Sequence, residues 1–133
     1  MTIANFIESL KAGSENPWRE TAIDVLLHGD PERELRGVAV TMMATQESIR
    51  EAAVQGCNLV VTHEPLFYHH QGQTSFLEGD AVYRAKREYL DAQGLCVFHL
   101  HDNLHSVKTD PISRGMARAL GWENSRTDES YYR

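Results

Sequence analysis

Short apolar runs alternate along the chain with segments in which apolar residues recur every three or four positions. Three such runs lie at residues 38–43, 59–62 and 95–100. A continuous apolar run rich in β-branched residues is typical of a strand buried on both faces of a sheet. Pro65 cannot donate the hydrogen bond of a further paired position, so the second of these strands is expected to end near Thr62.

Four amphipathic helices are predicted around these strands, each after a residue that can cap a helix and before a glycine that can end one. The capping residues are Thr2, Thr45, Asp80 and Asp110, and the glycines are Gly13, Gly56, Gly94 and Gly121. The positions expected to face inward are Ile3, Phe6, Ile7 and Leu10, then Ile49, Ala52 and Ala53, then Val82, Ala85, Tyr89 and Leu90, and finally Ile112, Met116, Ala119 and Leu120.

The order strand, helix, strand, helix, strand, helix implies parallel strands joined by right-handed crossovers, with helices packed against the sheet. The predicted class is therefore α/β, with a mostly parallel sheet and flanking helices. The segment 17–27 stays open, because Pro17 could begin a helix while residues 23–27 could equally be extended. At 133 residues the chain is expected to form one domain, placed at 1–122, followed by a polar linker or disordered tail at 123–133.

Side chains that could bind a metal ion follow two of the predicted strands directly. His63 and Glu64 come after the second strand, and His101, Asp102 and His105 come after the third. Ligands of an open α/β sheet usually bind at the carboxyl ends of its strands. Imidazole and carboxylate donors together suit zinc, manganese, iron or nickel. A histidine at a strand end can also be an ordinary hydrogen-bonded surface group, and this alternative stays open.

Three further polar side chains could act beside such a centre without being its ligands. Asp102 is expected to orient a ligand imidazole or to bind solvent, because in an extended segment it would point away from His101. His69 and His70 lie in the polar loop 68–75, where they could contact a ligand or a substrate, or be solvated.

Composition excludes several other classes of protein. A formal charge of −6 without a stripe of lysine and arginine argues against nucleic-acid binding. No apolar run approaches the roughly 20 residues of a membrane span, and the N-terminus lacks a basic segment followed by an apolar one. A cytoplasmic location is therefore expected. Cys57 and Cys96 lie in no CxxC pattern and are interpreted as small core residues.

The segments 26–31, 56–67 and 101–105, with Thr45 between the first two, resemble the amino-terminal half of the Nif-three-like family (NGG-one-interacting-factor-three-like proteins). Bacterial members of that family are often labelled GTP cyclohydrolase I type 2 homologues. The resemblance runs from about residue 24 to residue 122. It implies an α/β fold that forms one half of a two-part subunit, a dinuclear centre with two divalent metal ions, and a toroidal homohexamer.

The chain departs from the usual pattern of that family at its expected ligands. Usual members carry His-His-Pro after the central strand and His-Thr-Asn-Leu-Asp after the next. Here Glu64 stands where the second histidine is usual, and His105 stands where the aspartate is usual. The resemblance therefore implies a swapped ligand set of His63, Glu64 and His105, with His101 next to it. Further histidine and glutamate ligands of the family come from a carboxyl-terminal half that these 133 residues do not include.

The resemblance implies a metal-dependent hydrolase that acts on a small nucleotide-like molecule. The cyclohydrolase label suggests ring opening of a guanine nucleotide, although the sequence has no glycine-rich phosphate loop. A noncatalytic metal-binding scaffold, or a ring-forming interaction protein, is the alternative. A structural α/β subunit with solvated histidines is a third possibility.

Overall fold

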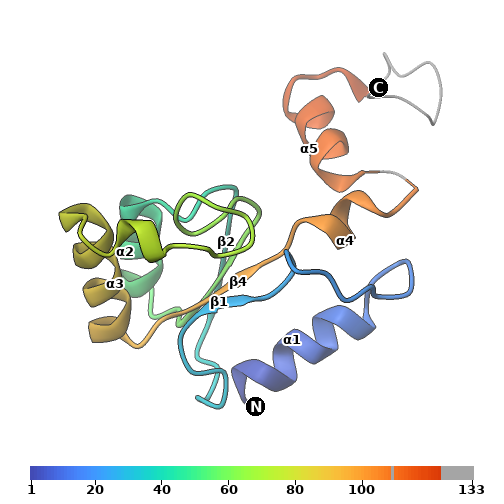
Figure 1. Cartoon of the computed structure of the whole chain (residues 1–133). Coiled ribbons are helices and arrows are strands. Elements are labelled where there is room, and N and C mark those ends of the chain that lie inside the picture. Colours follow the sequence, from blue (N-terminus) through green and yellow to red (C-terminus); the bar gives the residue numbers. More distant parts are fainter. Residues whose placement is uncertain (109, 124–133) are drawn as a thin grey trace.

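The computed structural model describes residues 1–108 and 110–123, and a four-stranded mixed sheet lies at its centre (Figure 1). The strands are β1 (Leu26–His28), β2 (Val38–Thr41), β3 (Leu59–Thr62) and β4 (Cys96–His99). Their order in the sheet is β1-β4-β3-β2. The last three are parallel, as predicted, whereas β1 runs antiparallel to β4. The segment left open in the sequence is therefore extended where it ends, and the α/β class is confirmed.

Helices cover both faces of the sheet. The helix α1 (Ile3–Ala12) packs on one face, where Ile3 and Ile7 join a cluster with Leu59, Val61, Cys96 and Phe98. The helices α2 (Gln46–Val54) and α3 (Ala81–Gln93) lie together on the other side (Figure 1). There Ile49 and Leu90 pack against Val60 and Val97. Both faces of β3 and β4 are thus buried, which explains why their sequences are continuously apolar.

The predicted helix caps are present, but part of the inward face of α3 was predicted wrongly. Thr2, Thr45 and Asp80 each accept a backbone hydrogen bond at the start of their helix. In α3 the predicted inward residue Val82 is 77% exposed, and Ala85 is exposed as well. Tyr83 is buried in their place, because its ring packs 4.5 Å from that of Phe67, which follows β3.

Two short helices, α4 (Asp102–His105) and α5 (Pro111–Ala119), extend away from the sheet beyond the end of β4 (Figure 1). The prediction of an inward face on α5 is wrong for most of its residues. Met116 and Leu120 are 58% and 53% exposed, Ala119 is exposed, and only Ile112 is partly buried. The apolar periodicity of α5 is real, but no other described element covers that face.

A short 3-10 helix, η1 (Ser75–Leu77), lies in the connection between β3 and α3. The predicted tail at 123–133 falls outside the described residues except for Glu123. In the described part of the chain, no helix has the length and apolar character needed to cross a membrane. The domain boundary at residue 122 stays a prediction.

Candidate metal centre

The parallel pairing of β3 with β4 brings the residues that follow both strands to one edge of the sheet. Thr62 is in register with His99, so the chain leaves both strands at the same level. His63 and His101 consequently stack, with ring centroids 4.5 Å apart and an interplanar angle of 18°. The one-turn helix α4 then brings His105 against the same pair, with its Nε2 3.3 Å from Nε2 of His63.

One nitrogen atom from each of His63, His101 and His105 lies within 4.8 Å of the other two. We call these three residues the three-histidine cluster. Sequence reasoning chose all three because they follow adjacent strands. The one-turn helix that turns His105 back toward His63 was not predicted, since the segment was expected to continue in an extended form.

Each ring of the three-histidine cluster is held through its Nδ1 atom by an oxygen. Nδ1 of His63 lies 3.3 Å from the carbonyl oxygen of Leu100. Nδ1 of His101 lies 3.0 Å from Oδ1 of Asp102, and Nδ1 of His105 lies 2.7 Å from Oδ2 of Asp110. A carbonyl or carboxylate oxygen can only accept, so each Nδ1 carries a hydrogen and donates it. The neutral form of each ring then keeps its free lone pair on Nε2.

This pattern of hydrogen bonds is the one that metal-binding histidines show. A ligand imidazole donates its second N–H to a carboxylate, a carbonyl or water, which fixes the tautomer and the orientation of the ring. In the three-histidine cluster, the lone pairs of His63 and His105 face one another across 3.3 Å. Two lone pairs at that distance repel unless a cation lies between them. The donor set therefore fits a first-row divalent ion.

The surroundings of His63 favour the neutral form of its ring. Its pKa is lowered from the ordinary value chiefly because burial disfavours the charged form, and the nearby His101 lowers it further. Burial alone would raise the pKa of Asp110, but hydrogen bonds from His105 and from the amides of Ile112 and Ser113 outweigh it and lower the pKa. The lowered pKa of His63 favours the neutral imidazole that metal binding requires, and the lowered pKa of Asp110 favours an ionised carboxylate behind His105.

A buried carboxylate that the sequence did not reveal fixes the start of α4. Asp24 is 2% exposed, and its Oδ1 accepts hydrogen bonds from the amides of His101 and Asp102. Its Oδ2 accepts from both the amide and the side chain of Asn103. The carboxylate thus caps the one-turn helix that begins just after His101 and ends at His105. Asp24 lies in the segment that the sequence left open, 77 residues before His101, and no local pattern marks the pairing.

Glu64 and Asp102, the two carboxylates predicted for this region, have different positions. Asp102 does not point away from His101 as expected, because it begins α4 instead of continuing an extended segment, and its Oδ1 lies 3.0 Å from Nδ1 of His101, where it can orient that ring. Glu64 is partly buried and does not belong to the cluster, which holds no carboxylate among the described residues. Its amide donates to the carbonyl of Met42, so the ladder between β2 and β3 continues past the strand ends. In such an extended segment the side chains of consecutive residues point in alternate directions, so Glu64 is expected to point away from His63. The role of Glu64 as a ligand stays a prediction.

The remaining histidines near the site have distinct surroundings. The ring of His70 stacks on His99 at 5.5 Å and lies edge-on to His101 at 5.2 Å. His99, which sequence reasoning treated only as part of a strand, is fully buried and donates from Nε2 to the carbonyl of His63 at 2.9 Å. Its pKa is lowered mainly by burial. His69 instead lines a separate pocket, and its Nδ1 accepts from the amide of Gln71.

Comparison with known proteins identifies relatives of this chain. The sequence profile of the family described as Duf34/NIF3 (NGG1p interacting factor 3) matches residues 2–131. A Clostridium acetobutylicum protein named GTP cyclohydrolase 1 type 2 homolog is 28% identical over 100 residues, which make up 75% of this chain and 36% of that protein.

Solved structures show the same fold. Staphylococcus aureus protein SA1388 is 27% identical and superimposes with a TM-score of 0.69, over 91% of this chain and 34% of its own. A Bacillus cereus protein related to NIF3 is 18% identical with a TM-score of 0.70, over 91% of this chain and 33% of its own. The chain therefore spans about a third of the length of these relatives.

Proposed function

The chain belongs to the Duf34/NIF3 family, and from that premise we propose that it binds a divalent metal ion through His63, His101 and His105 to support hydrolysis of a small nucleotide-like molecule. The observation that carries the proposal is the orientation of the three rings. Each gives its Nδ1 hydrogen to an oxygen, which leaves three Nε2 atoms available as ligands.

The residues of the site have separable roles in this proposal. His63, His101 and His105 would hold the ion, while Asp102 and Asp110 orient two of the rings and increase their basicity. Three protein ligands leave at least one coordination position open, as in catalytic rather than structural zinc sites. A divalent ion at such a site supplies Lewis acidity and activates water near neutral pH.

The expected second metal ion, oligomeric state and substrate rest on the family resemblance. We propose a second divalent ion, for which Glu64 is the candidate ligand nearest in sequence to His63. We also propose a homohexameric ring, which light scattering would test. A strictly monomeric protein at micromolar concentration would contradict the ring. The name of the Clostridium relative, GTP cyclohydrolase 1 type 2 homolog, makes GTP the first substrate to test.

Metal content is the first test of the proposal. We expect His63→Ala to lose most of the bound metal, measured by elemental analysis after dialysis against a zinc or manganese buffer. His69→Ala is the matched control, since it removes an imidazole that lies outside the three-histidine cluster. Equal metal content in the two variants would overturn the assignment of the site.

Catalysis needs a second test with the metal-loaded protein. We expect hydrolysis of GTP or a related small molecule by the parent protein, with little activity in His63→Ala. A noncatalytic scaffold is the second candidate, and the exposed apolar residues Val40, Met116 and Leu120 favour it because they are suited to association. Metal binding without turnover of any substrate in the panel would support the scaffold.

A further inference from the structure

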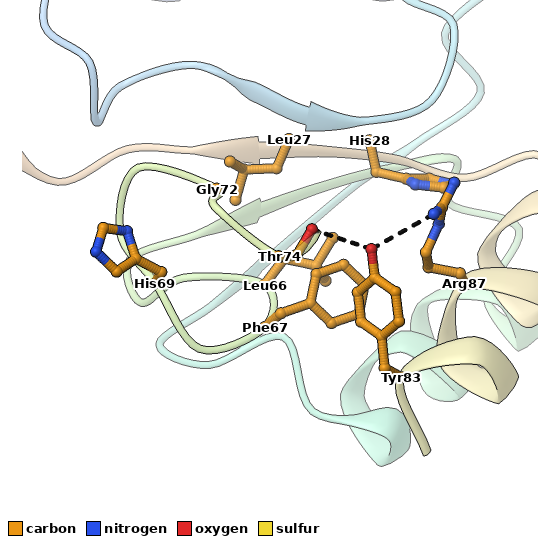
Figure 2. Close-up of a pocket in the computed structure, with 9 residues that line it drawn as sticks. All are labelled: Leu27, His28, Leu66, Phe67, His69, Gly72, Thr74, Tyr83 and Arg87. Carbon is orange, nitrogen blue, oxygen red and sulfur yellow. Dashed lines mark hydrogen bonds between the residues drawn. The ribbon is translucent and has the colours of Figure 1, made fainter. Parts of the chain in front are cut away.

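A pocket separate from the three-histidine cluster lies between β1, the loop that follows β3, and α3 (Figure 2). Its volume is about 250 Å³, and nine residues line it. None of them belongs to the three-histidine cluster. The pocket is therefore a separate candidate site, although the loop that supplies His69 to it also supplies His70 to the surroundings of His101.

Hydrogen-bond donors gather along one side of this pocket. The hydroxyl groups of Thr74 and Tyr83 lie 3.0 Å apart, and Nη1 of Arg87 donates to the Tyr83 oxygen at 3.4 Å (Figure 2). If the Tyr83 hydroxyl donates its hydrogen bond to the Thr74 oxygen, the Thr74 hydroxyl can donate its own hydrogen to a ligand. At the other end His69 accepts from the amide of Gln71 through Nδ1, so its neutral ring carries the hydrogen on Nε2.

The charge of the lining is opposite to that of the chain as a whole. The chain carries a formal charge of −6, yet the lining of the pocket includes Arg87 and no aspartate or glutamate. His28, drawn beside Arg87 in Figure 2, places its Nε2 2.9 Å from Oδ1 of Asp91, which lies outside the lining. A guanidinium group with hydroxyl donors beside it is suited to an oxyanion, because it can form charge-assisted hydrogen bonds to two oxygens.

The wall beside these donors is apolar and aromatic. Leu66 is buried, and the ring of Phe67 lies 4.5 Å from that of Tyr83. Small-molecule pockets usually measure about 300–1,000 Å³, so this one is suited to a ligand smaller than a nucleotide. We propose that the pocket binds the phosphate or carboxylate group of a small molecule whose body is short and apolar or aromatic.

Calorimetric titration with three probes tests this site, namely inorganic phosphate, phenyl phosphate and benzoate. The titrations are run on the parent protein and on His63→Ala, so that an anion bound by a metal ion is not mistaken for one in the pocket. We expect phenyl phosphate or benzoate to bind more tightly than inorganic phosphate, because only these two can use the apolar wall. Whichever of phenyl phosphate and benzoate binds more tightly shows whether the pocket prefers a phosphate or a carboxylate group. Binding should persist in His63→Ala even if the proposed hydrolysis fails.

Two arginine variants show whether the probes bind in this pocket. Arg87→Gln should weaken the tighter probe about tenfold or more, because it removes a charge-assisted donor. Arg84→Gln makes the same change of charge on the same helix outside the lining, and we expect a change of less than about twofold. Equal losses in the two variants would overturn the proposal. So would the absence of saturable binding of all three probes up to about 10 mM.

Discussion

Replacing Asp24 by asparagine should both destabilise the fold and weaken metal binding. The carboxylate is buried, and four backbone or amide N–H groups of residues 101–103 point at its two oxygens. An asparagine keeps one acceptor oxygen but turns an NH₂ group toward the donors on the other side. At least two buried N–H groups then lose their acceptor.

The expected cost follows from the energy of those hydrogen bonds. A hydrogen bond to a charged group contributes about 1.5–3 kcal/mol, and an unsatisfied buried donor costs about 1–3 kcal/mol. We therefore expect Asp24→Asn to lower the free energy of unfolding by roughly 3–4 kcal/mol. Because His101 precedes α4 directly and His105 ends it, the affinity for a divalent ion should fall as well, by about tenfold or more.

Urea denaturation and metal titration measure the two effects. Asp30→Asn is the matched control, since Asp30 is exposed and accepts a local hydrogen bond from the amide of Glu32. We expect it to change stability by less than about 0.5 kcal/mol. An Asp24→Asn variant that matches Asp30→Asn in both assays would refute the role assigned to the buried carboxylate.

Three other substitutions have expected outcomes. Asp110→Asn should keep the cap of α5 but present an NH₂ group to Nδ1 of His105, which favours the tautomer of His105 that carries its hydrogen on Nε2. Metal titration should therefore show an affinity lower by about 10–100-fold, while the circular dichroism spectrum stays unchanged. Gly29→Ala should cost roughly 2–4 kcal/mol in urea denaturation, because φ is +92° and the new Cβ would lie 2.6 Å from the Sγ atom of Cys96. Burial lowers the pKa of Lys86 to about 8, so between that pH and the ordinary lysine pKa the unfolded chain binds more protons than the folded chain. The stability of the parent protein relative to Lys86→Met should therefore rise with pH, by about 1 kcal/mol once the partial exposure of the side chain is allowed for. A stability difference between the two proteins that stays constant from about pH 8 to pH 10 in denaturation experiments would contradict this.

Local signals made most of the fold predictable. The residues Thr2, Thr45 and Asp80 cap helices where the sequence places them, because a cap depends on residues within one turn. The continuous apolar character of the runs in β3 and β4 likewise reports burial on both faces. Periodicity marked the apolar face of α5 as well, but it shows only which side is apolar and not what covers it. Met116 is therefore exposed against expectation.

The candidate site was predictable only as far as strand topology determines it. Parallel pairing of β3 and β4 is sufficient to bring His63 and His101 together, because both follow a carboxyl strand end. Alternation along an extended chain is consistent with Glu64 lying outside the three-histidine cluster, but it fails for Asp102, which begins α4 and contacts His101. Asp24 could not be predicted, because its partners lie far along the chain and are chosen by the antiparallel docking of β1.

The place of β1 in the sheet has a consequence for the nascent chain. β1 is the first strand to be synthesised, but its sheet partner β4 follows about 70 residues later. At roughly 5–20 residues per second, the ribosome needs about 4–14 s to deliver that partner. Until then β1 has no edge to join, and Asp24 has no helix to cap. We therefore expect metal loading to follow the synthesis of β4 and α4, so that bound metal does not guide the earlier folding of the chain.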